Sequence, residues 1–302
     1  MAIKNVALLG ANGDLGAPML HVLIAAGTFH ITVLQRRSSK STPFTDPSVS
    51  IVKVDDDMSL ESLHEALKGQ DAVIASFRPR DVDVHLRLAD AAAAAGVKRF
   101  IPADFGSCDS SSKRVQDLVP LFLAKLYVRE RLEELAAAKP DFTWTSFVTG
   151  HLFDWGLKEN FLHFNLKTRT ADIFDDGKYR SSTSTLERVS EAVVKVLQNE
   201  EIGQNKMLFV QSFCVSQLDV LASLEKATGD KWKVNWLESE KFIKERKVKA
   251  DAGDKEAVED LVFALGAVDG DWEGKDDFAM ETLGLKNQDL DEVVQRVVSE
   301  TK

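Results

Sequence analysis

The chain of 302 residues carries a net charge of −10 and is 44% hydrophobic, enough apolar material for one large domain or two intimate ones. Its basic residues are dispersed except at positions 36–40, so we expect no nucleic-acid partner. No apolar run has the length of a membrane span, and no signal peptide precedes the first predicted strand, so we expect a cytoplasmic protein without a membrane partner. Two cysteines give no disulfide framework, and the six histidines lack paired ligand spacing, so we predict no metal site.

The first half of the chain alternates between short apolar runs and longer segments with helical character. The runs predict strands at 3–9, 31–35, 49–54, 71–76, 97–102 and 142–148, and the segments predict helices at 17–26, 59–67, 82–95 and 119–138. This alternation is typical of an α/β fold with a parallel, doubly wound sheet of the Rossmann type. Right-handed crossovers would place the carboxyl ends of all these strands on one edge, where ligands bind.

The second half is less regular. Short strands are predicted at 171–174, 179–182 and 206–210, and helices at 185–198, 216–228, 238–247, 254–265 and 287–299. No Pro/Gly/Ser-rich linker separates the two halves. We therefore expect an NAD(P)-binding Rossmann domain over residues 1–150 and a smaller α+β substrate lobe over residues 151–302. The lobe should pack intimately on the first domain, with room for some of its strands to rejoin the main sheet.

The strongest motif follows the first predicted strand, which ends in a turn with three glycines before a helix. Such a turn places unpaired backbone N–H groups and a positive helix end at one point, which suits a pyrophosphate. We expect Gly10 to form the tight turn, Gly13 to let the phosphates approach, and Gly16 to let the helix pack closely. The spacing G-x-x-G-x-x-G is not the commonest fingerprint, and a glycine turn without a ligand is the alternative. The residues predicted to contact the cofactor here are Gly10, Asn12, Gly13, Asp14, Leu15 and Gly16.

The choice of dinucleotide depends on the end of the second strand. NAD-binding folds usually place a carboxylate there, whereas NADP-binding folds place a basic group for the extra phosphate. This chain has Arg36-Arg37-Ser38-Ser39-Lys40 and no carboxylate in that stretch. Arginine can bind a phosphate through two parallel hydrogen bonds, and lysine adds a point charge. We therefore predict NADP(H), held in part by Arg36, Arg37 and Lys40; a solvated basic loop is the alternative.

Three further segments follow predicted strands and should reach the same edge of the sheet. They are Ser76–Pro79, Pro102–Cys108 and Thr149–Trp155. From the first two we expect further cofactor contacts by Ser76, Phe77, Arg78, Ala103, Asp104 and Phe105. For a flat hydrophobic substrate the candidates are Phe105, His151, Phe153 and Trp155, although packing in the core is an alternative for the aromatic residues.

Four motifs in this order resemble one known family. They are Gly10–Gly16, Val33–Arg36, Phe100–Gly106 and Phe122–Arg129. Together they are similar to the isoflavone-reductase-like and NmrA-like group of atypical short-chain dehydrogenases, and Thr149–Leu157 is most similar to its fungal branch. The resemblance covers nearly the whole chain and implies a Rossmann domain, a smaller substrate lobe, NADPH and a role in secondary metabolism. It also implies that Lys125, the lysine of the F-x-x-K-x-x-V-R motif, lies near the nicotinamide and ribose and assists proton transfer.

Two residues are candidates for the proton donor. The Tyr-x-x-x-Lys pair of typical short-chain dehydrogenases is missing, because Tyr127 is followed four residues later by Arg131, which stays protonated. Lys125 can serve if it lies in a dry pocket; otherwise it is an exposed helix lysine. His151 is the second candidate, because histidine is the commonest acid or base near neutral pH. A hydrogen-bonded structural histidine is the alternative for that position.

These expectations combine into one preferred function. The resemblance implies an NADPH-dependent reductase of a small aromatic or conjugated carbonyl, enone or benzylic ether, acting as a monomer or homodimer. Two alternatives stay open. The first is a non-catalytic NADP(H) sensor that binds a regulatory protein, as NmrA-like members do, and the second is an NADP-dependent isomerase or dehydratase.

Overall fold

The computed structural model describes residues 2–40, 46–79 and 81–301. The chain forms two compact units that interleave along the sequence. The first unit comprises Met1–Asp104, Leu121–Phe147 and Val189–Leu208, and the second comprises Phe105–Pro120, Val148–Arg188 and Phe209–Lys302. How the residues pack into two units does not say what each unit binds. The predicted assignment of cofactor and substrate roles to residues 1–150 and 151–302 therefore stays a prediction.

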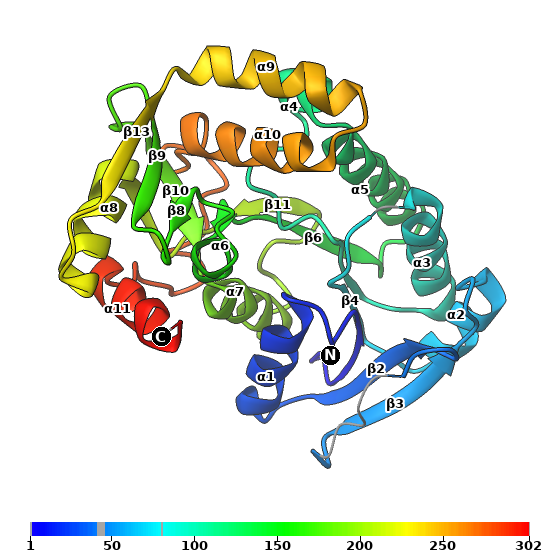
Figure 1. Ribbon diagram of the computed structural model, residues 1–302. Coiled ribbons are helices and arrows are strands. Elements are labelled where there is room, and N and C mark those ends of the chain that lie inside the picture. Colours follow the sequence, from blue (N-terminus) through cyan, green and yellow to red (C-terminus); the bar gives the residue numbers. More distant parts are fainter. Residues whose placement is uncertain (1, 41–45, 80, 302) are drawn as a thin grey trace. The chain divides into compact units, whose positions relative to one another are not determined.

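A seven-stranded sheet forms the centre of the first unit (Figure 1). Its order is β11-β6-β5-β4-β1-β2-β3, and every pairing from β6 through β3 is parallel. The strands are β1 (Asn5–Leu9), β2 (His30–Arg36), β3 (Val49–Val54), β4 (Ala72–Ala75), β5 (Arg99–Ile101), β6 (Thr143–Val148) and β11 (Lys206–Phe209). The strand order reverses between β1 and β4, which is the switch point where doubly wound sheets bind ligands. The predicted Rossmann-type α/β fold is confirmed.

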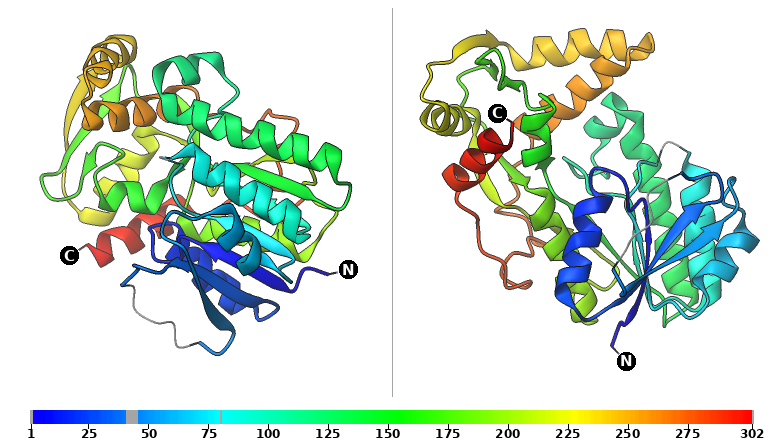
Figure 2. Two further views of the ribbon diagram at one scale, coloured as in Figure 1. Left: turned by 90° about the vertical axis from the view of Figure 1, so that its right-hand side faces the viewer. Right: turned by 60° about the horizontal axis from the view of Figure 1, so that its bottom comes forward.

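Helices cover both faces of this sheet. One face carries α2 (Leu60–Leu67), α3 (Val82–Ala95) and α5 (Pro120–Ala138), and the other carries α1 (Gly16–Ala26) and α7 (Leu186–Gln198), as Figures 1 and 2 show. The α2/α3/α5 face is dry because leucines and alanines of these helices pack on the valines, alanines and aromatic rings of the strands. Side-chain caps fix where two of the helices begin, since Ser59 accepts from the Ser62 amide and Asp81 from the Asp83 amide.

The second unit contains two small sheets and most of the remaining helices. One sheet has the order β12-β10-β7, and the other has the order β13-β9-β8. The strands are β7 (His151–Leu152), β8 (Phe164–Asn165), β9 (Thr170–Phe174), β10 (Arg180–Ser184), β12 (Phe213–Ser216) and β13 (Lys233–Leu237). The helices are α4 (Lys113–Leu118), α6 (Phe153–Lys158), α8 (Gln217–Thr228), α9 (Ser239–Asp251), α10 (Lys255–Val268) and α11 (Leu290–Glu300). Of all the helices described, none is both long enough and apolar enough to cross a lipid bilayer.

Candidate cofactor and proton-transfer site

The glycine turn after β1 is held against the end of β4. Gly10 has a φ of +85°, and a Cβ atom at this position would lie 2.8 Å from the main-chain oxygen of Ser76. A Cβ atom on Gly16 would lie 1.9 Å from the carbonyl oxygen of Gly10. Ser76 fixes the arrangement, because its amide and its hydroxyl both donate to the Leu9 carbonyl, at 2.9 and 2.6 Å. Only glycine fits at positions 10 and 16, for the turn and for close helix packing respectively.

Gly13 has more room than the other two glycines. A Cβ atom there would lie 3.3 Å from the Gly10 carbonyl oxygen, which is tight without being prohibitive. The main chain around it is open, because Asn12–Asp14 are exposed. Leu15 stands at the N-cap position of α1 and makes no side-chain cap, and the first turn of α1 holds no acidic residue. An uncapped helix N-terminus beside exposed main chain fits the pyrophosphate of a dinucleotide.

Two adjacent arginines, Arg36 as the last residue of β2 and Arg37 directly after it, have different surroundings. Arg37 is committed to a carboxylate, because its Nε donates to Asp55 Oδ1 at 2.9 Å. The Arg36 side chain is exposed, and within residues 2–40, 46–79 and 81–301 no hydrogen bond to its guanidinium is found. Lys40 is also exposed. The Asp56 carboxylate, which accepts from the Ser38 amide at 2.8 Å, adds a negative charge to this basic segment. Arg36 still keeps its donors available for a phosphate.

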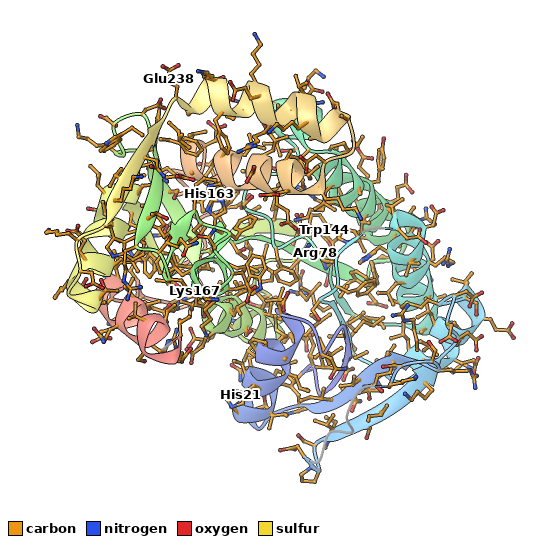
Figure 3. All side chains as sticks on the ribbon, viewed as in Figure 1. His21, Arg78, Trp144, His163, Lys167 and Glu238 are labelled. Carbon is orange, nitrogen blue, oxygen red and sulfur yellow. The ribbon has the colours of Figure 1, made fainter. Side chains whose placement is uncertain are left out.

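The segment after β4 presents three different environments. Ser76 is buried and its hydroxyl donates to the turn, whereas the side chain of Arg78, labelled in Figure 3, is exposed. Phe77 is half-buried and stacks on the ring of His85, with the two ring centres 4.1 Å apart. The predicted cofactor contacts of these residues stay predictions.

A buried ion cluster lies where β5 ends. The Lys125 side chain is 9% exposed, and its ammonium donates to the main-chain carbonyl of Asp104. The same nitrogen lies 4.0 Å from Asp104 Oδ1 and 5.1 Å from the centre of the Phe122 ring. The structure therefore brings together Asp104 and Lys125, two residues that sequence reasoning selected separately. Lys125 is not the exposed helix lysine of the alternative interpretation.

Two further side chains hold the Asp104 carboxylate in place. The Ser146 hydroxyl donates to Asp104 Oδ2 at 2.5 Å, and the Arg129 guanidinium lies 3.6 Å from the same oxygen. Lys125 and Arg129 are one helical turn apart on α5, so both reach the same carboxylate. The F-x-x-K-x-x-V-R motif thus places two cations on one buried aspartate. The contributions of Arg129 and Ser146 were not predicted from the sequence, because they depend on the end of β5 meeting α5 and β6.

A small pocket adjoins this cluster within the first unit. Its lining residues are Pro79, His85, Pro102, Ala103, Asp104, Lys125 and Val128. His85 is the member that sequence reasoning missed. A single histidine in the alanine-rich segment 82–95 carries no signal that separates it from an ordinary core residue.

His151, the second candidate donor, belongs to the second unit and is buried among aromatic rings. Its ring centre lies 5.8 Å from that of Phe161 and 5.9 Å from that of Phe263. The Nε2 atom lies 3.4 Å from the Val262 carbonyl. Burial lowers the pKa of His151 to about 4, so the ring is neutral near neutral pH. Its predicted catalytic role stays a prediction, and its surroundings favour the structural alternative.

The predicted substrate residues of the second unit are not equally accessible. Phe153 is 1% exposed and meets the Phe213 ring edge-on at 4.9 Å, which is a core position. Trp155 is half-buried beside Phe161, with ring centres 5.4 Å apart. Phe105 is half-buried and has a φ of +35°, a conformation that residues other than glycine rarely adopt outside functional sites. Trp155 and Phe105 are therefore better placed than Phe153 to meet a ligand.

One group of side chains in the described residues has the spacing of metal ligands. The ligand atoms of Cys214, Asp271 and Glu273 all lie within 4.8 Å of one another. Arg180 occupies the same region, because its guanidinium donates to the Cys214 carbonyl at 2.8 Å and lies 3.6 Å from Glu273. A cation already paired with these groups disfavours a metal ion there. The expected lack of a metal site stays a prediction.

The sheet order and the glycine turn are those of dinucleotide-binding folds. Comparisons with known proteins identify the family within this class. The model of the NmrA-like family matches residues 3–263. Oxidoreductase aprR of Aspergillus flavus is 34% identical over 303 residues, covering 99% of each chain. Oxidoreductase poxI of Penicillium oxalicum is 32% identical over 301 residues, covering 95% of this chain and 92% of poxI. The leucoanthocyanidin reductase–NADPH complex of Vitis vinifera shares the fold, with a TM-score of 0.77 at 16% identity over 98% of this chain and 100% of that one.

The chain belongs to the NmrA-like family. The resemblance predicted from its four motifs is confirmed, and its relatives place it among the oxidoreductases of that family.

Proposed function

We propose that this protein is an NADP(H)-dependent reductase in which Lys125 is the proton donor. The observation that carries the proposal is the buried contact of the Lys125 ammonium with Asp104, at the end of a strand in a Rossmann-type sheet. A lysine whose only role is solubility keeps its side chain exposed, whereas the Lys125 side chain is 9% exposed and its nitrogen lies 4.0 Å from a carboxylate oxygen. The names of the relatives aprR and poxI, both oxidoreductases, support the same class of activity.

Two parts of the first unit would hold the dinucleotide: the turn after β1 with the start of α1, and Arg36 at the end of β2. The open main chain at Asn12–Asp14 and the uncapped start of α1 would bind the pyrophosphate. Arg36 would bind the 2′-phosphate, because its guanidinium is exposed while that of Arg37 is bonded to Asp55. The reduced nicotinamide, when bound, supplies a hydride to the substrate.

Reduction of a carbonyl or a conjugated bond creates negative charge that a proton must neutralise. The Lys125 ammonium can supply it, since it is fixed by the Asp104 carbonyl and shielded from water. Asp104 is a positioning residue in this account, and Arg129 and Ser146 hold its carboxylate. The dry surroundings strengthen the electrostatic effect of the ammonium on a developing anion.

We infer an aromatic or conjugated substrate of the carbonyl, enone or benzylic ether type. The family resemblance motivates this class, and the half-buried rings of Phe105 and Trp155 could bind a flat molecule.

The test is a turnover assay with NADPH and a panel of aromatic ketones, enones and benzylic ethers, followed through cofactor absorbance. We expect NADPH oxidation with at least one member and none with the Lys125→Ala variant on the same timescale. Tight binding of NADP(H) without turnover, together with a co-purifying protein, is the result that the sensor alternative predicts. Product formation with no net consumption of NADPH would favour the isomerase or dehydratase.

A further inference from the structure

The pocket beside Lys125 has an unusual set of polar atoms. Four of its lining residues, Pro79, Pro102, Ala103 and Val128, offer apolar walls. The other three are Lys125, a donor of hydrogen bonds, and Asp104 and His85, each of which has a buried polar atom that makes no hydrogen bond within the described residues. A buried acceptor left unpaired costs free energy, so two in one pocket call for an explanation.

The state of the His85 ring follows from its partners. The side chain is 1% exposed, and its ring stacks on Phe77 at 4.1 Å between centres. The ring hydrogen-bonds the main chain of Arg78, and burial lowers the pKa of His85 to about 4, so the ring is neutral near neutral pH. Because Nε2 lacks a partner among the described atoms, Nδ1 carries the hydrogen and donates it to the Arg78 carbonyl. Within the part of the chain that the structure describes, Nε2 is therefore an acceptor that receives no hydrogen bond.

The Asp104 carboxylate presents a second acceptor. Its Oδ2 receives the Ser146 hydroxyl, whereas Oδ1 has no hydrogen bond in the described structure and lies 4.0 Å from the Lys125 nitrogen. The pocket thus combines an ammonium donor with two acceptors. A carbonyl group could accept from Lys125 but could donate to neither acceptor. A carboxylate or phosphate would add the repulsion of Asp104. A hydroxyl group can accept from the Lys125 ammonium and donate its one hydrogen to one of the two acceptors. Because Asp104 Oδ1 already lies 4.0 Å from the Lys125 ammonium, we assign the donated hydrogen bond to His85 Nε2.

We propose that this pocket binds a hydroxyl group of a ligand, which donates to His85 Nε2 and accepts from the Lys125 ammonium. The proposal rests on the proposed function, because that function supplies two sources of such a group. One is a ribose hydroxyl in the nicotinamide half of the dinucleotide, and the other is the alcohol of a substrate or product. His85 on α3 is then a binding residue that lines the same pocket as Lys125 on α5.

Nitrogen-15 NMR of the histidine-labelled wild-type protein tests this directly, with the His85 signals assigned by their loss in His85→Gln. We expect the free protein to show a bare Nε2 and a protonated Nδ1. A shift of Nε2 on addition of NADP⁺, but not of adenosine 2′,5′-bisphosphate, identifies the ribose hydroxyl. A shift that needs benzyl alcohol added to the NADP⁺ complex identifies the substrate side. An equal shift with the bisphosphate would reflect the adenosine end and would overturn the proposal.

Two variants give an independent measure by calorimetry. His85→Phe keeps the stacked ring and removes the acceptor, so it should weaken the relevant ligand by about 3- to 10-fold, the range for one neutral hydrogen bond. His85→Gln retains an acceptor oxygen and should recover most of that loss. The proposal is overturned if NADP⁺ binds the wild-type protein, Nε2 does not shift with any ligand, and His85→Phe binds NADP⁺ and benzyl alcohol normally. Failure of NADP⁺ to bind the wild-type protein would instead sink the proposed function, and benzyl alcohol titrated alone would then decide on the pocket.

Discussion

Lys125 in the first unit and His151 in the second are both buried, yet their surroundings differ in kind. Lys125 has a carboxylate and a carbonyl of Asp104 beside its nitrogen. His151 has two phenyl rings and the Val262 carbonyl, 3.4 Å from Nε2, and burial lowers its pKa to about 4. Burial alone therefore does not identify a proton donor. What distinguishes the two residues is whether the surroundings hold the charged form, and only the Lys125 site does so.

The largest expected effect comes from removing the ammonium. Lys125→Ala should lower kcat by roughly 10²- to 10⁴-fold, the contribution of one positioned acid or base. The affinity for NADPH should stay within a few-fold. Lys139→Ala is the matched control, because Lys139 also donates to a main-chain carbonyl, that of Ala93, at 2.7 Å. Steady-state kinetics and calorimetry measure both variants. Normal turnover by Lys125→Ala would show that Lys125 is not the proton donor.

The His151 side of the comparison concerns stability rather than rate. His151→Ala would leave a cavity among aromatic rings and should reduce the free energy of unfolding by about 2–5 kcal/mol. The loss in kcat should be smaller than that of Lys125→Ala. Gly266→Ala should also destabilise the protein, because a Cβ atom there would lie 2.3 Å from His151 Nε2. Urea unfolding monitors both variants; a folded and stable His151→Ala protein with no turnover would make His151 the donor.

Much of the first unit could be predicted from the sequence because local signals set its boundaries. The predicted segments 49–54 and 82–95 coincide with β3 and α3, and the latter lies between the capping side chain of Asp81 and the left-handed Gly96. The Gly10 turn was also predictable, since its glycines are required by main-chain geometry.

The start of α11 in the second unit was predicted too early, at residue 287. The helix begins at Leu290 because Asp289 caps it.

The rest depends on contacts between distant residues. β13 was missed because it is short, has no buried residue and alternates Lys233 and Asn235 with its apolar residues. Its pairing with β9 is what makes it a strand. The helices α4 and α6 have six residues each, too short for a periodic pattern to stand out. The surroundings of Lys125 could not be foreseen beyond Asp104. Arg129 and Ser146 reach the Asp104 carboxylate, and His85 reaches the adjoining pocket, only after the sheet and helices have assembled.

A smaller effect should distinguish the two arginines at the end of β2, Arg36 and Arg37. Arg36→Ala should weaken NADPH binding by about 1.5–3 kcal/mol, the value of a hydrogen bond to a charged group, and leave NADH nearly unchanged. Arg37→Ala should weaken NADPH less, because that guanidinium is bonded to Asp55 at 2.9 Å. Calorimetry with both nucleotides compares the variants. Equal losses for the two would mean that the exposed side chain of Arg36 is not the phosphate ligand.

The smallest effect concerns His163 in the second unit (Figure 3). Burial opposes its charged form, but hydrogen bonds to Asp172 and Asp260, at 3.0 and 3.1 Å, outweigh burial and raise the pKa of His163 above 6.5. Its stabilising contribution is therefore complete below pH 6.5 and is lost as the pH rises through the folded-state value. The free energy of unfolding should fall more steeply above that pH in the wild-type protein than in His163→Asn. Parallel pH profiles would show that the two carboxylates do not stabilise a charged ring.

The most direct test of the central claim is the binding of NADPH and NADH to the unmodified protein, measured by calorimetry under one set of conditions. The account predicts that NADPH binds more tightly than NADH. The exposed Arg36 can donate to a 2′-phosphate, and residues 36–40 contain no carboxylate that could accept from the ribose hydroxyls. Equal affinities, or tighter binding of NADH, would contradict it.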